Sequence, residues 1–363
     1  MPGQRPASTD ELDRARSIVL RHGWNATAYQ ILNPGIMLWF SDAGDGVVGH
    51  VTRHRVRVVV GAPVCAHARL ADCAAEFERD AARRGERVCY FGAGERLESI
   101  YARSAEHSMM RLGGQPAWDP SHWPEILRSH ASLRAQLNRA RNKGVAVAEW
   151  DSARAQEHPE LSRCLTEWLA ARRLPPMHFM VEPWTLSRLA DRRVFVAERA
   201  GGVVAFLLAS PVPERAGWLV EQIIRGRNAS NGTAELMIDT AMRAFADEGA
   251  RYITLGLAPL SRRSGAPAGD SSAWLRLLLL WIRAHGRRFY NFDGLDAFKA
   301  KFRPERWEPI HAVTTERRFS PRSLYAIAAA FADGSPVVLV ARAMVRAAVQ
   351  EGRWMARRVG TSR

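Results

Sequence analysis

Short apolar segments rich in β-branched residues alternate with helical segments along most of the chain. Residues 55–64 (RVRVVVGAPV) end in Gly-Ala-Pro, a helix is expected to about residue 84, and residues 87–94 (RVCYFGAG) follow as a strand. A strand, a helix and a strand in this order predict a parallel pair with a crossover helix. This pattern restricts the fold most strongly, because it places the chain in the α/β class.

A second cycle of strands and helices follows the first. It comprises a strand at 145–150 (VAVAEW), a helix around 159–172, a hairpin (RVFVAE and VVAFLLAS joined by RAGG), a strand at 217–225 (GWLVEQIIR), a helix over about 233–248 and a strand at 251–257 (RYITLGL). At 363 residues, the chain is long enough for two domains with separate cores. We therefore expect two similar mixed α/β halves, joined near residues 116–144, rather than one large sheet.

The joining segment 125–144 (EILRSHASLRAQLNRARNKG) predicts a helix that stops at Gly144. Leucines form a partial apolar stripe and cations occupy the rest of the turn: Leu127, Leu133, Leu137, Arg134, Arg139, Arg141 and Lys143. Such a run is either a solvated face or a helix that contacts the phosphates of a nucleic acid.

The formal net charge of +15 and the pI near 10.7 indicate a polyanionic partner, either nucleic acid or an anionic membrane surface. The alternative is a genome-wide bias toward arginine. Composition alone does not separate the two.

Secretion, disulfides and membrane spans are not indicated. The four cysteines lack C-x-x-C spacing, so we expect reduced thiols in a cytosolic protein. The N-terminus has no apolar signal region, and Ser8 with Glu11 instead forms a capping-box pattern. Since no apolar run approaches 18 residues, we expect a protein that does not cross membranes.

The segment after residue 319 differs from the rest. A helix there would place four arginines on one side: Arg342, Arg346, Arg353 and Arg357. A basic amphipathic helix of this kind either lies on an anionic membrane or packs its apolar face on the protein's own core.

Common catalytic motifs are absent, as is histidine spacing for a metal, so neither a metal nor a cofactor is expected. Glu221 is an acid within an apolar strand, which is costly unless it is paired or used, and Arg225 is a candidate partner. Asn231 and Gly232 predict a tight turn before a helix, with backbone N–H groups available to an anion or carbonyl. In acyltransferases that use acetyl-CoA, a glycine-containing turn of this kind binds the pyrophosphate of coenzyme A. The glycine spacing that those enzymes need is not present at this turn, which disfavours acetyl-CoA as a donor.

Lysine is rare in this chain. Of 52 basic residues, three are lysine, and Lys299 and Lys301 lie two residues apart. A compact ammonium can reach a phosphate or a developing oxyanion where a planar guanidinium needs a different geometry. The alternative is two solvated lysines on one face of a strand.

Four segments carry a resemblance to a known family: LRAQLNRARNKG, NGTAELMID, TLGLAPLS and FYNFDGLDAFKAKFRPERWEPI. In this order, over about residues 55 to 315, they resemble the C-terminal catalytic domain of the phosphatidylglycerol lysyltransferase (multiple peptide resistance factor) family, which includes alanyl-phosphatidylglycerol synthases. The resemblance implies tandem GNAT-like folds, a role in antimicrobial peptide resistance, and transfer of an aminoacyl group from charged tRNA to a lipid hydroxyl.

The resemblance also implies site residues. Glu221 lies ten residues before Asn231, where the family has an acid that is usually Asp. The family's arginine three residues after that acid would fall on Ile224, and Arg225 is adjacent. We assign the following roles: catalytic, Glu221, Arg225, Lys299 and Lys301; substrate-binding, Asn231, Gly232, Glu235 and Arg303; tRNA-binding, Arg134, Arg139, Arg141 and Lys143.

We expect a GNAT-like domain at 1–122, a catalytic GNAT-like domain at 123–318 that begins with the basic helix, and a basic tail at 319–363. Known family members carry a multi-span membrane domain ahead of the catalytic one, and none is seen here, so a stand-alone soluble protein is expected. It would be cytoplasmic, with peripheral contact at the inner face of the membrane left open.

Three hypotheses follow from the sequence. The first is an aminoacyl-tRNA-dependent transferase acting on an anionic phospholipid such as phosphatidylglycerol. The second is the same chemistry with a soluble or other lipid acceptor, and the third is a non-catalytic tRNA- or membrane-binding protein. The amino acid and the oligomeric state are not readable from the sequence.

Overall fold

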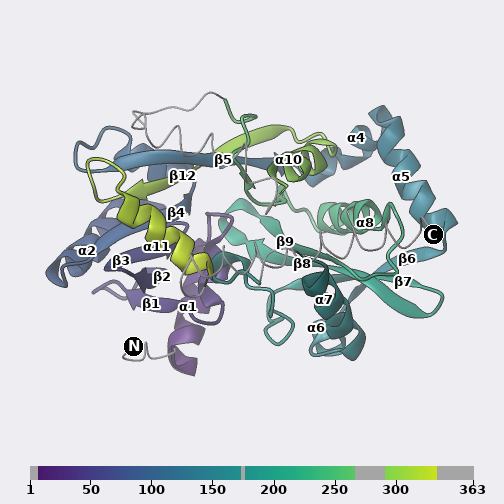
Figure 1. Cartoon of the computed structure of the whole chain (residues 1–363), viewed down its shortest axis with the longest axis horizontal. Helices are drawn as coiled ribbons and strands as arrows, with labels where there is room; N and C mark the ends of the chain where they lie inside the picture. Colours follow the sequence, from purple (N-terminus) through teal and green to yellow (C-terminus); the bar gives the residue numbers. More distant parts are fainter. Residues whose placement is uncertain (1–6, 173–175, 266–290, 333–363) are drawn as a thin grey trace, which may run out of the picture.

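The computed structural model describes residues 7–172, 176–265 and 291–332 (Figure 1). In this part of the chain, the strands form one 12-stranded mixed sheet in the order β1-β2-β3-β4-β12-β5-β10-β9-β8-β7-β6, with β11 paired to β5. The strands are β1 (Met37–Phe40), β2 (Val47–Arg53), β3 (Val56–Val60), β4 (Arg87–Ala93), β5 (Ser108–Trp118), β6 (Val145–Trp150), β7 (Arg193–Arg199), β8 (Gly202–Val212), β9 (Gly217–Arg225), β10 (Tyr252–Thr254), β11 (Ala258–Pro259) and β12 (Arg306–Thr314).

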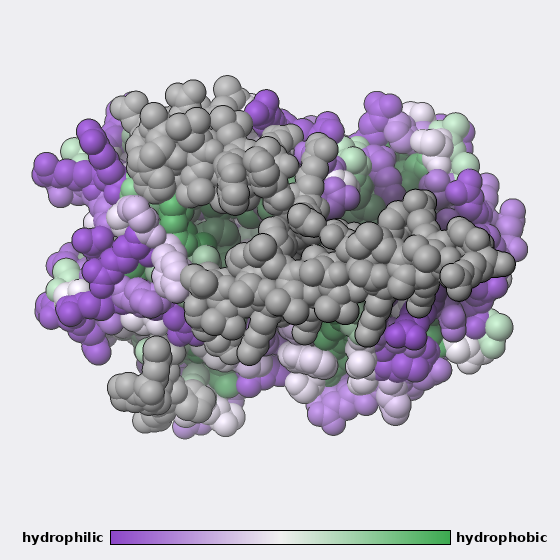
Figure 2. Space-filling model, viewed as in Figure 1, coloured by the Kyte–Doolittle hydropathy of each residue, from purple (hydrophilic) through white to green (hydrophobic). Residues whose placement is uncertain are grey.

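Helices cover both faces of the sheet. They are α1 (Thr9–His22), α2 (Leu70–Arg83), α3 (Glu95–Tyr101), α4 (Trp123–Ser129), α5 (Ala131–Asn142), α6 (Ser152–Ala155), α7 (Pro159–Ala171), α8 (Thr233–Asp247), α10 (Phe292–Ala300) and α11 (Pro321–Ala332), with short 3-10 turns η1 (Ala28–Leu32), η2 (His67–Arg69), η3 (Pro120–His122), η4 (Phe179–Val181) and η5 (Pro213–Arg215). Along β8, Leu207 packs toward α5 and α8 whereas Phe206 and Leu208 pack toward α7, as strand alternation requires. Hydrophilic residues cover much of the described surface on the face seen in Figure 2.

The predicted α/β class is confirmed, and so are the main elements of both cycles. The expected capping box of α1 is present, because Glu11 N–H donates to Ser8 Oγ and Ser8 N–H donates to Glu11. The expectation of two halves rather than one large sheet is wrong in one respect. Strands of both halves share the sheet, because β10 pairs with β5 and β12 lies between β4 and β5. The boundaries after residues 122 and 318 stay predictions.

The predicted basic helix is broken. His130 has non-helical backbone angles (φ −120°, ψ 83°) and separates α4 from α5. Arg134 bridges the break, since its Nη1 donates to the carbonyls of Leu127 and Arg128 at 2.6 and 2.5 Å. The predicted stop is confirmed, because α5 ends at Asn142 with Lys143 as its C-cap, and Gly144 follows with a left-handed φ of 76°.

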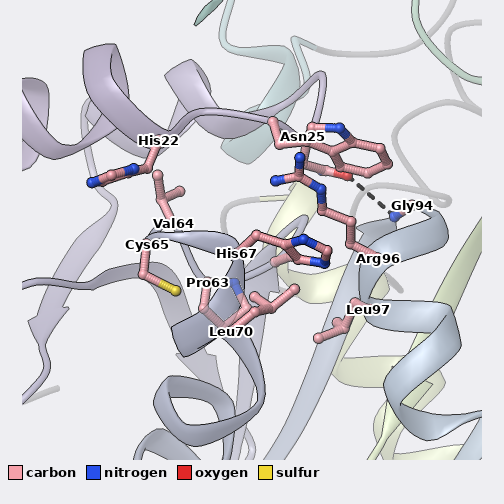
Figure 3. A pocket seen from close by; sticks show the side chains of 12 residues that line it. His22, Asn25, Pro63, Val64, Cys65, His67, Leu70, Gly94, Arg96 and Leu97 are labelled. Atoms are coloured by element: carbon pink, nitrogen blue, oxygen red, sulfur yellow. Dashed lines mark hydrogen bonds between the residues drawn. The ribbon is translucent and has the colours of Figure 1, made fainter. Parts of the chain in front are cut away.

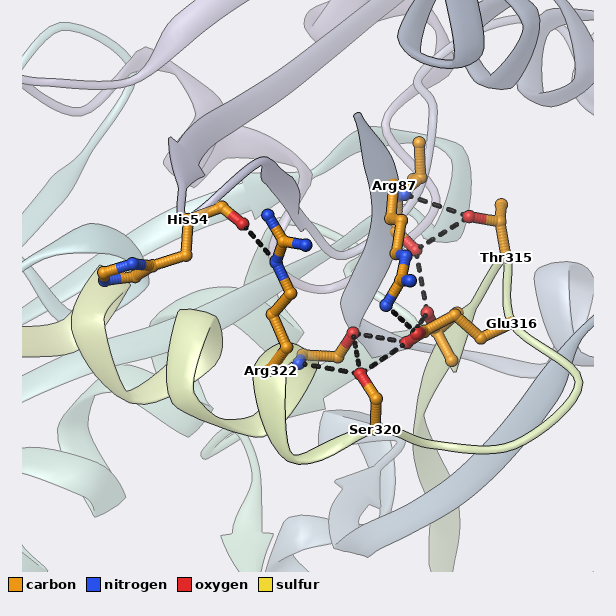
Figure 4. A network of polar contacts seen from close by, with 9 residues as sticks. His54, Arg87, Thr315, Glu316, Ser320 and Arg322 are labelled. Atoms are coloured by element: carbon orange, nitrogen blue, oxygen red, sulfur yellow. Dashed lines mark hydrogen bonds and ion pairs between the residues drawn. The ribbon is translucent and has the colours of Figure 1, made fainter. Parts of the chain in front are cut away.

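The start of the predicted tail packs on the first half of the molecule. Glu316, just after β12, accepts hydrogen bonds from Arg87 of β4 and from Ser320 (3.1 Å), while Arg322 donates to the carbonyl of His54 at 2.7 Å (Figure 4). Ile327 of α11 joins the core formed with β2 and β3. The four arginines of the predicted amphipathic helix, from Arg342 onward, lie outside the described residues.

Candidate functional site

The sheet opens between β9 and β10. These parallel strands pair only over Gly217–Leu219 and Tyr252–Thr254, although β9 continues to Arg225. In Figure 1, α8 lies on one side of β9 and α7 on the other. The carboxyl ends of neighbouring parallel strands are a frequent place for ligand sites, and this opening is therefore the candidate site.

Glu221 lies two residues past Leu219, the last residue of β9 that pairs with β10. In the register with β8, Val220 faces Ala209 and Gln222 faces Leu208, so Glu221 is the extra residue of a β-bulge. A bulge turns a side chain away from the regular alternation of the strand. The sheet thus gives this acid a direction that an uninterrupted strand would not.

Arg192 holds the Glu221 carboxylate. Its Nε lies 3.0 Å from Oε1 and its Nη2 lies 3.3 Å from Oε2. The same Nη2 donates to Oδ1 of Asn33 (3.0 Å), and Nη1 donates to the carbonyl of Arg188 (2.8 Å). The side chains of Arg192 and Glu221 are only 2% and 7% exposed, so two buried charges compensate each other.

The proposed partnership of Glu221 with Arg225 is wrong. Arg225 is exposed at the end of β9, four residues further along, which is about 13 Å on an extended strand. The arginine that the acid meets comes from the loop before β7, and Asn33 comes from the first half of the chain.

Lys299 of α10 fixes the end of β10. Its Nζ donates to three successive carbonyls, those of Leu255 (2.7 Å), Gly256 (2.8 Å) and Leu257 (2.8 Å). Three acceptors converging on one atom match the three N–H bonds of an ammonium and not a planar guanidinium. Burial lowers the pKa of Lys299 to about 7, and Asp296 opposes that shift.

In this structure the Nζ of Lys299 is bonded to the backbone, and its predicted contact with a phosphate or an oxyanion stays a prediction. The alternative of two solvated lysines on a strand face is wrong. Both lysines lie at the end of helix α10, and Lys299 is buried.

Lys301 points to a different partner. It forms an ion pair with Glu235 in the first turn of α8, and its Nζ lies 4.4 Å from the ring centre of Phe298. Arg303, two residues later, donates from Nε to Nε2 of His130 at 2.8 Å. Lys301, Glu235 and Arg303 therefore connect α10 to α8 and to the start of α5.

The predicted turn before α8 is present, and α5 closes one side of it. Gly232 has a φ of 95°, and a Cβ there would lie 2.2 Å from the carbonyl oxygen of Gln136. Both the left-handed backbone and the contact require glycine. Asn231 is exposed beside it. The structure thus brings Gly232, Glu235, Lys301 and Arg303 together around α5.

The four cations predicted to bind tRNA do not form one free face. Arg134 is held by the backbone at the break between α4 and α5, and Arg141 pairs with the buried Asp239 at 3.0 Å. Arg139 and Lys143 are exposed. Their predicted role in binding tRNA stays a prediction.

Sequence reasoning missed Arg192 and Asn33. Arginine is so frequent in this chain that Arg192 carries no distinguishing signal. Asn33 lies in the other half of the sequence, and only the tertiary structure brings it to the Arg192 guanidinium.

The first half contains an equivalent pair of parallel strands, β3 and β4, whose carboxyl ends are filled. Asn25 donates to the carbonyl of Gly92 at 3.1 Å. It also accepts from the N–H of Gly94 at 3.1 Å (Figure 3). The cavity that remains beside Trp24 and Arg96 measures about 20 Å³. That volume holds about one water molecule, so Asn25 and its neighbours leave little enclosed space at this end of the first pair.

Comparisons with known proteins agree with this architecture. A family model described as "Phosphatidylglycerol lysyltransferase, C-terminal" matches residues 16–314. The phosphatidylglycerol lysyltransferase of Bacillus subtilis (strain 168) is 23% identical over 302 residues, covering 81% of this chain and 34% of that protein. The chain thus spans about a third of the length of this curated relative.

Two solved structures have a similar fold. The C-terminal domain of a lysylphosphatidylglycerol synthetase from Agrobacterium fabrum has a TM-score of 0.76 at 22% identity, covering 90% of this chain and 99% of that one. The L-PGS structure from Bacillus licheniformis has a TM-score of 0.72 at 18% identity, covering 95% and 98%. At these identities the likeness concerns the fold.

Proposed function

The chain belongs to the family of phosphatidylglycerol lysyltransferase C-terminal domains, and from this premise we propose that it transfers an aminoacyl group from a charged tRNA to the hydroxyl of a phosphatidylglycerol-type lipid. The observation that carries the proposal is the opening between β9 and β10. Glu221 with Arg192 borders it on β9, and the carbonyls held by Lys299 follow the end of β10.

The proposed reaction exchanges one ester for another. The ester bond to the tRNA ribose breaks, a new ester forms on the lipid hydroxyl, and the proton of that hydroxyl passes to the ribose oxygen. No external energy source is needed, so the protein must align two polyanionic substrates, exclude water and stabilise the tetrahedral oxyanion.

Within this scheme, Glu221 binds the α-ammonium of the aminoacyl group or orients the acceptor hydroxyl. Arg192 keeps the carboxylate in one orientation, since both side chains are buried and two contacts join them. Lys299 acts as a positioning residue that fixes the backbone after β10.

Access to a lipid requires contact with a membrane surface, which we propose to be peripheral. Within residues 7–172, 176–265 and 291–332, every helix is too short or too polar to traverse a bilayer. The net charge of +15 supports attraction to an anionic surface.

The test combines the purified protein with bacterial tRNA charged with labelled amino acids and with phosphatidylglycerol vesicles. We expect label to enter the organic phase, and Glu221→Gln, Arg192→Gln and Lys299→Ala to abolish this transfer. Arg225→Gln is the matched control, because it removes an exposed arginine from the same strand. Label lost from tRNA without lipid product indicates another acceptor. No loss of label at all contradicts the proposed reaction.

A further inference from the structure

The Arg192 guanidinium that holds Glu221 also packs on a side chain from the first half of the chain. Its central carbon lies 4.8 Å from the ring centre of Tyr29, which belongs to η1. Tyr29 and Arg192 are both buried. The edges of the guanidinium are bonded to Glu221, Asn33 and the carbonyl of Arg188, while the aromatic ring covers one of its faces. The orientation of this planar group is therefore fixed both within its plane and perpendicular to it.

The hydroxyl of Tyr29 holds the two residues that precede Arg192. It donates to the carbonyl of Ala190 and lies 3.0 Å from Oδ2 of Asp191. Asp191 has a left-handed φ of 61°, a conformation that is uncommon for a residue other than glycine and that persists where surrounding contacts favour it. A single tyrosine thus bonds the turn before Arg192 and packs on the Arg192 side chain.

The Asp191 carboxylate is held a second time, by helix α1. Arg16 donates to it from Nε and from Nη2, both at 2.5 Å, which is the paired geometry of a guanidinium on a carboxylate. Burial acts to raise the pKa of Asp191, but the hydrogen bonds from Arg16 and Tyr29 outweigh burial and hold that pKa below its ordinary value. The turn before Arg192 is therefore bonded to α1 and to η1, two elements of the first half.

The position of Tyr29 is fixed by contacts of η1 with both halves. Gln30 donates from Nε2 to Oγ of the buried Ser210 in β8 at 3.1 Å, and the carbonyl of Leu32 accepts from Arg188 at 3.0 Å. The ring of Tyr29 belongs to the core that η1 forms with β2 and β3. A reacting group needs neighbours that are themselves held in place, and Tyr29 meets this requirement.

We propose that Tyr29 is a positioning residue of the transfer reaction, which acts through Arg192 to hold the Glu221 carboxylate in its reactive orientation. The inference rests on the proposed function, which places Glu221 at the reacting groups. A displacement of about 1 Å at a reacting group can lower a rate about 100-fold. The first half of the chain thereby takes part in the reaction, because it fixes the acid of the second half.

A second buried tyrosine of the first half provides a matched control. Tyr90 of β4 donates from its hydroxyl to Glu78 at 2.9 Å, much as Tyr29 does to Asp191. Replacing either tyrosine with Phe removes one hydroxyl that bonds a carboxylate, so the two variants should lose similar stability. A merely structural role predicts equal transfer rates for the two variants, whereas a positioning role predicts a lower rate for the Tyr29 variant.

The test measures kcat and KM for transfer of labelled aminoacyl groups from charged tRNA to phosphatidylglycerol vesicles. We expect kcat to fall about tenfold in Tyr29→Phe, which keeps the ring, and about 100-fold in Tyr29→Leu, which removes it. The KM for charged tRNA should stay within about twofold, because Tyr29 is buried, and kcat of Tyr90→Phe should also stay within about twofold. Urea unfolding checks that each variant is folded in the assay.

A second readout observes the guanidinium directly. The Nε–H of Arg192 donates to Glu221, so its exchange with solvent is slow as long as the pair is held. Its NMR signal is assigned by its loss in Arg192→Lys. We expect exchange to be at least about tenfold faster in Tyr29→Phe than in the wild type, and unchanged in Tyr90→Phe.

Equal kcat in Tyr29→Phe and Tyr90→Phe would overturn the inference and leave the proposed function standing. A raised KM with unchanged kcat in Tyr29→Phe would overturn it as well. If the wild type transfers no label, the proposed function fails and the exchange rates stand by themselves. Faster exchange in Tyr29→Phe would then support the positioning of Glu221 by Tyr29, and unchanged exchange would overturn it.

Discussion

The molecule contains two parallel strand pairs of the same topology, and the pair in the second half stays together over a shorter length. In the first half, β3 and β4 pair over five residues (Val56–Val60 with 87–91), and α2 crosses between them. In the second half, β9 and β10 pair over three residues, with α8 as the crossover helix. The strands β9 and β10 therefore separate after a shorter paired length than β3 and β4 do.

The two pairs also differ in the groups at their carboxyl ends, which are neutral in the first pair and charged in the second. Asn25, a neutral amide, bridges the loop after β4 and leaves a cavity of about 20 Å³. The second pair is bordered by a buried ion pair and a buried lysine. Buried charges of this kind are costly for stability and are more frequent at functional sites, so the difference supports the proposal that the second half carries the chemistry.

The largest expected effect comes from removing one charge of the buried pair. Glu221→Ala leaves Arg192 buried without a carboxylate, and we expect the free energy of unfolding to fall by about 3–5 kcal/mol. In the first half, Asn25→Ala removes neutral hydrogen bonds and should cost about 1–2 kcal/mol. Urea unfolding at pH 7 measures both. Equal losses in the two halves would remove the energetic contrast between them.

The two halves should also respond to different pH ranges. Burial lowers the pKa of Lys299 from 10.5 to about 7 and, in the first half, lowers that of His50 from 6.5 to about 3. At pH values between the lowered and the ordinary pKa of each group, the unfolded chain binds more protons than the folded chain. The free energy of unfolding therefore rises with pH, by up to about 1.4 kcal/mol per pH unit for each group.

Variants separate these two contributions. Lys299→Met should reduce the rise of the unfolding free energy between about pH 7 and 10.5, and His50→Gln should reduce the rise between about pH 3 and 6.5. The measurement is urea unfolding across each range, with each variant as the control for the other. A wild-type rise above pH 7 that survives in Lys299→Met would show that Lys299 is not its source.

A glycine follows the first strand of each pair, and replacing it with alanine should lower the free energy of unfolding by a smaller amount. Gly232→Ala places a Cβ 2.2 Å from the backbone oxygen of Gln136 at a φ of 95°, and we expect a loss of about 2–3 kcal/mol. Gly61→Ala meets the Asn25 side chain instead, at a φ of 68°, and should cost about 1 kcal/mol because a side chain can move. Thermal unfolding ranks the two, and the reverse order would indicate that α5 yields more easily than Asn25.

The smallest effect is expected for Arg225→Gln. Its side chain is exposed at the end of β9, so stability should change by less than about 0.5 kcal/mol, and transfer should stay within about twofold of the wild type. Initial rates with charged tRNA measure this. A loss of transfer rate as large as that of Arg192→Gln would show that Arg225 takes part in the site.

Much of the fold was predictable because its signals are local. The βαβ units, the hairpin of β7 and β8, the bounds of β9 and the capping box at Ser8 follow from side-chain periodicity and from turn residues within a few positions. The break at His130 was missed because neighbouring leucines and arginines continue a helical pattern across it.

The candidate site was predictable only in part. Glu221 stands out as an acid in an apolar strand, and Lys299 stands out in a chain that uses arginine for most of its cations. Their partners did not stand out. Lys299 meets backbone carbonyls, which every residue possesses, and Arg192 is one of many arginines.

The sequence by itself determined the elements, the fold class and the family likeness, since those depend on patterns within short segments and ordered motifs. The tertiary structure alone decided that β12 returns between β4 and β5, that β9 separates from β10 after three pairs, and that Arg192 lies between Glu221 and Asn33. The last contact joins residues 159 positions apart, and its energy depends on exclusion of water by the packed halves. A local pattern carries no record of such a contact, because the contact exists only after the chain has folded.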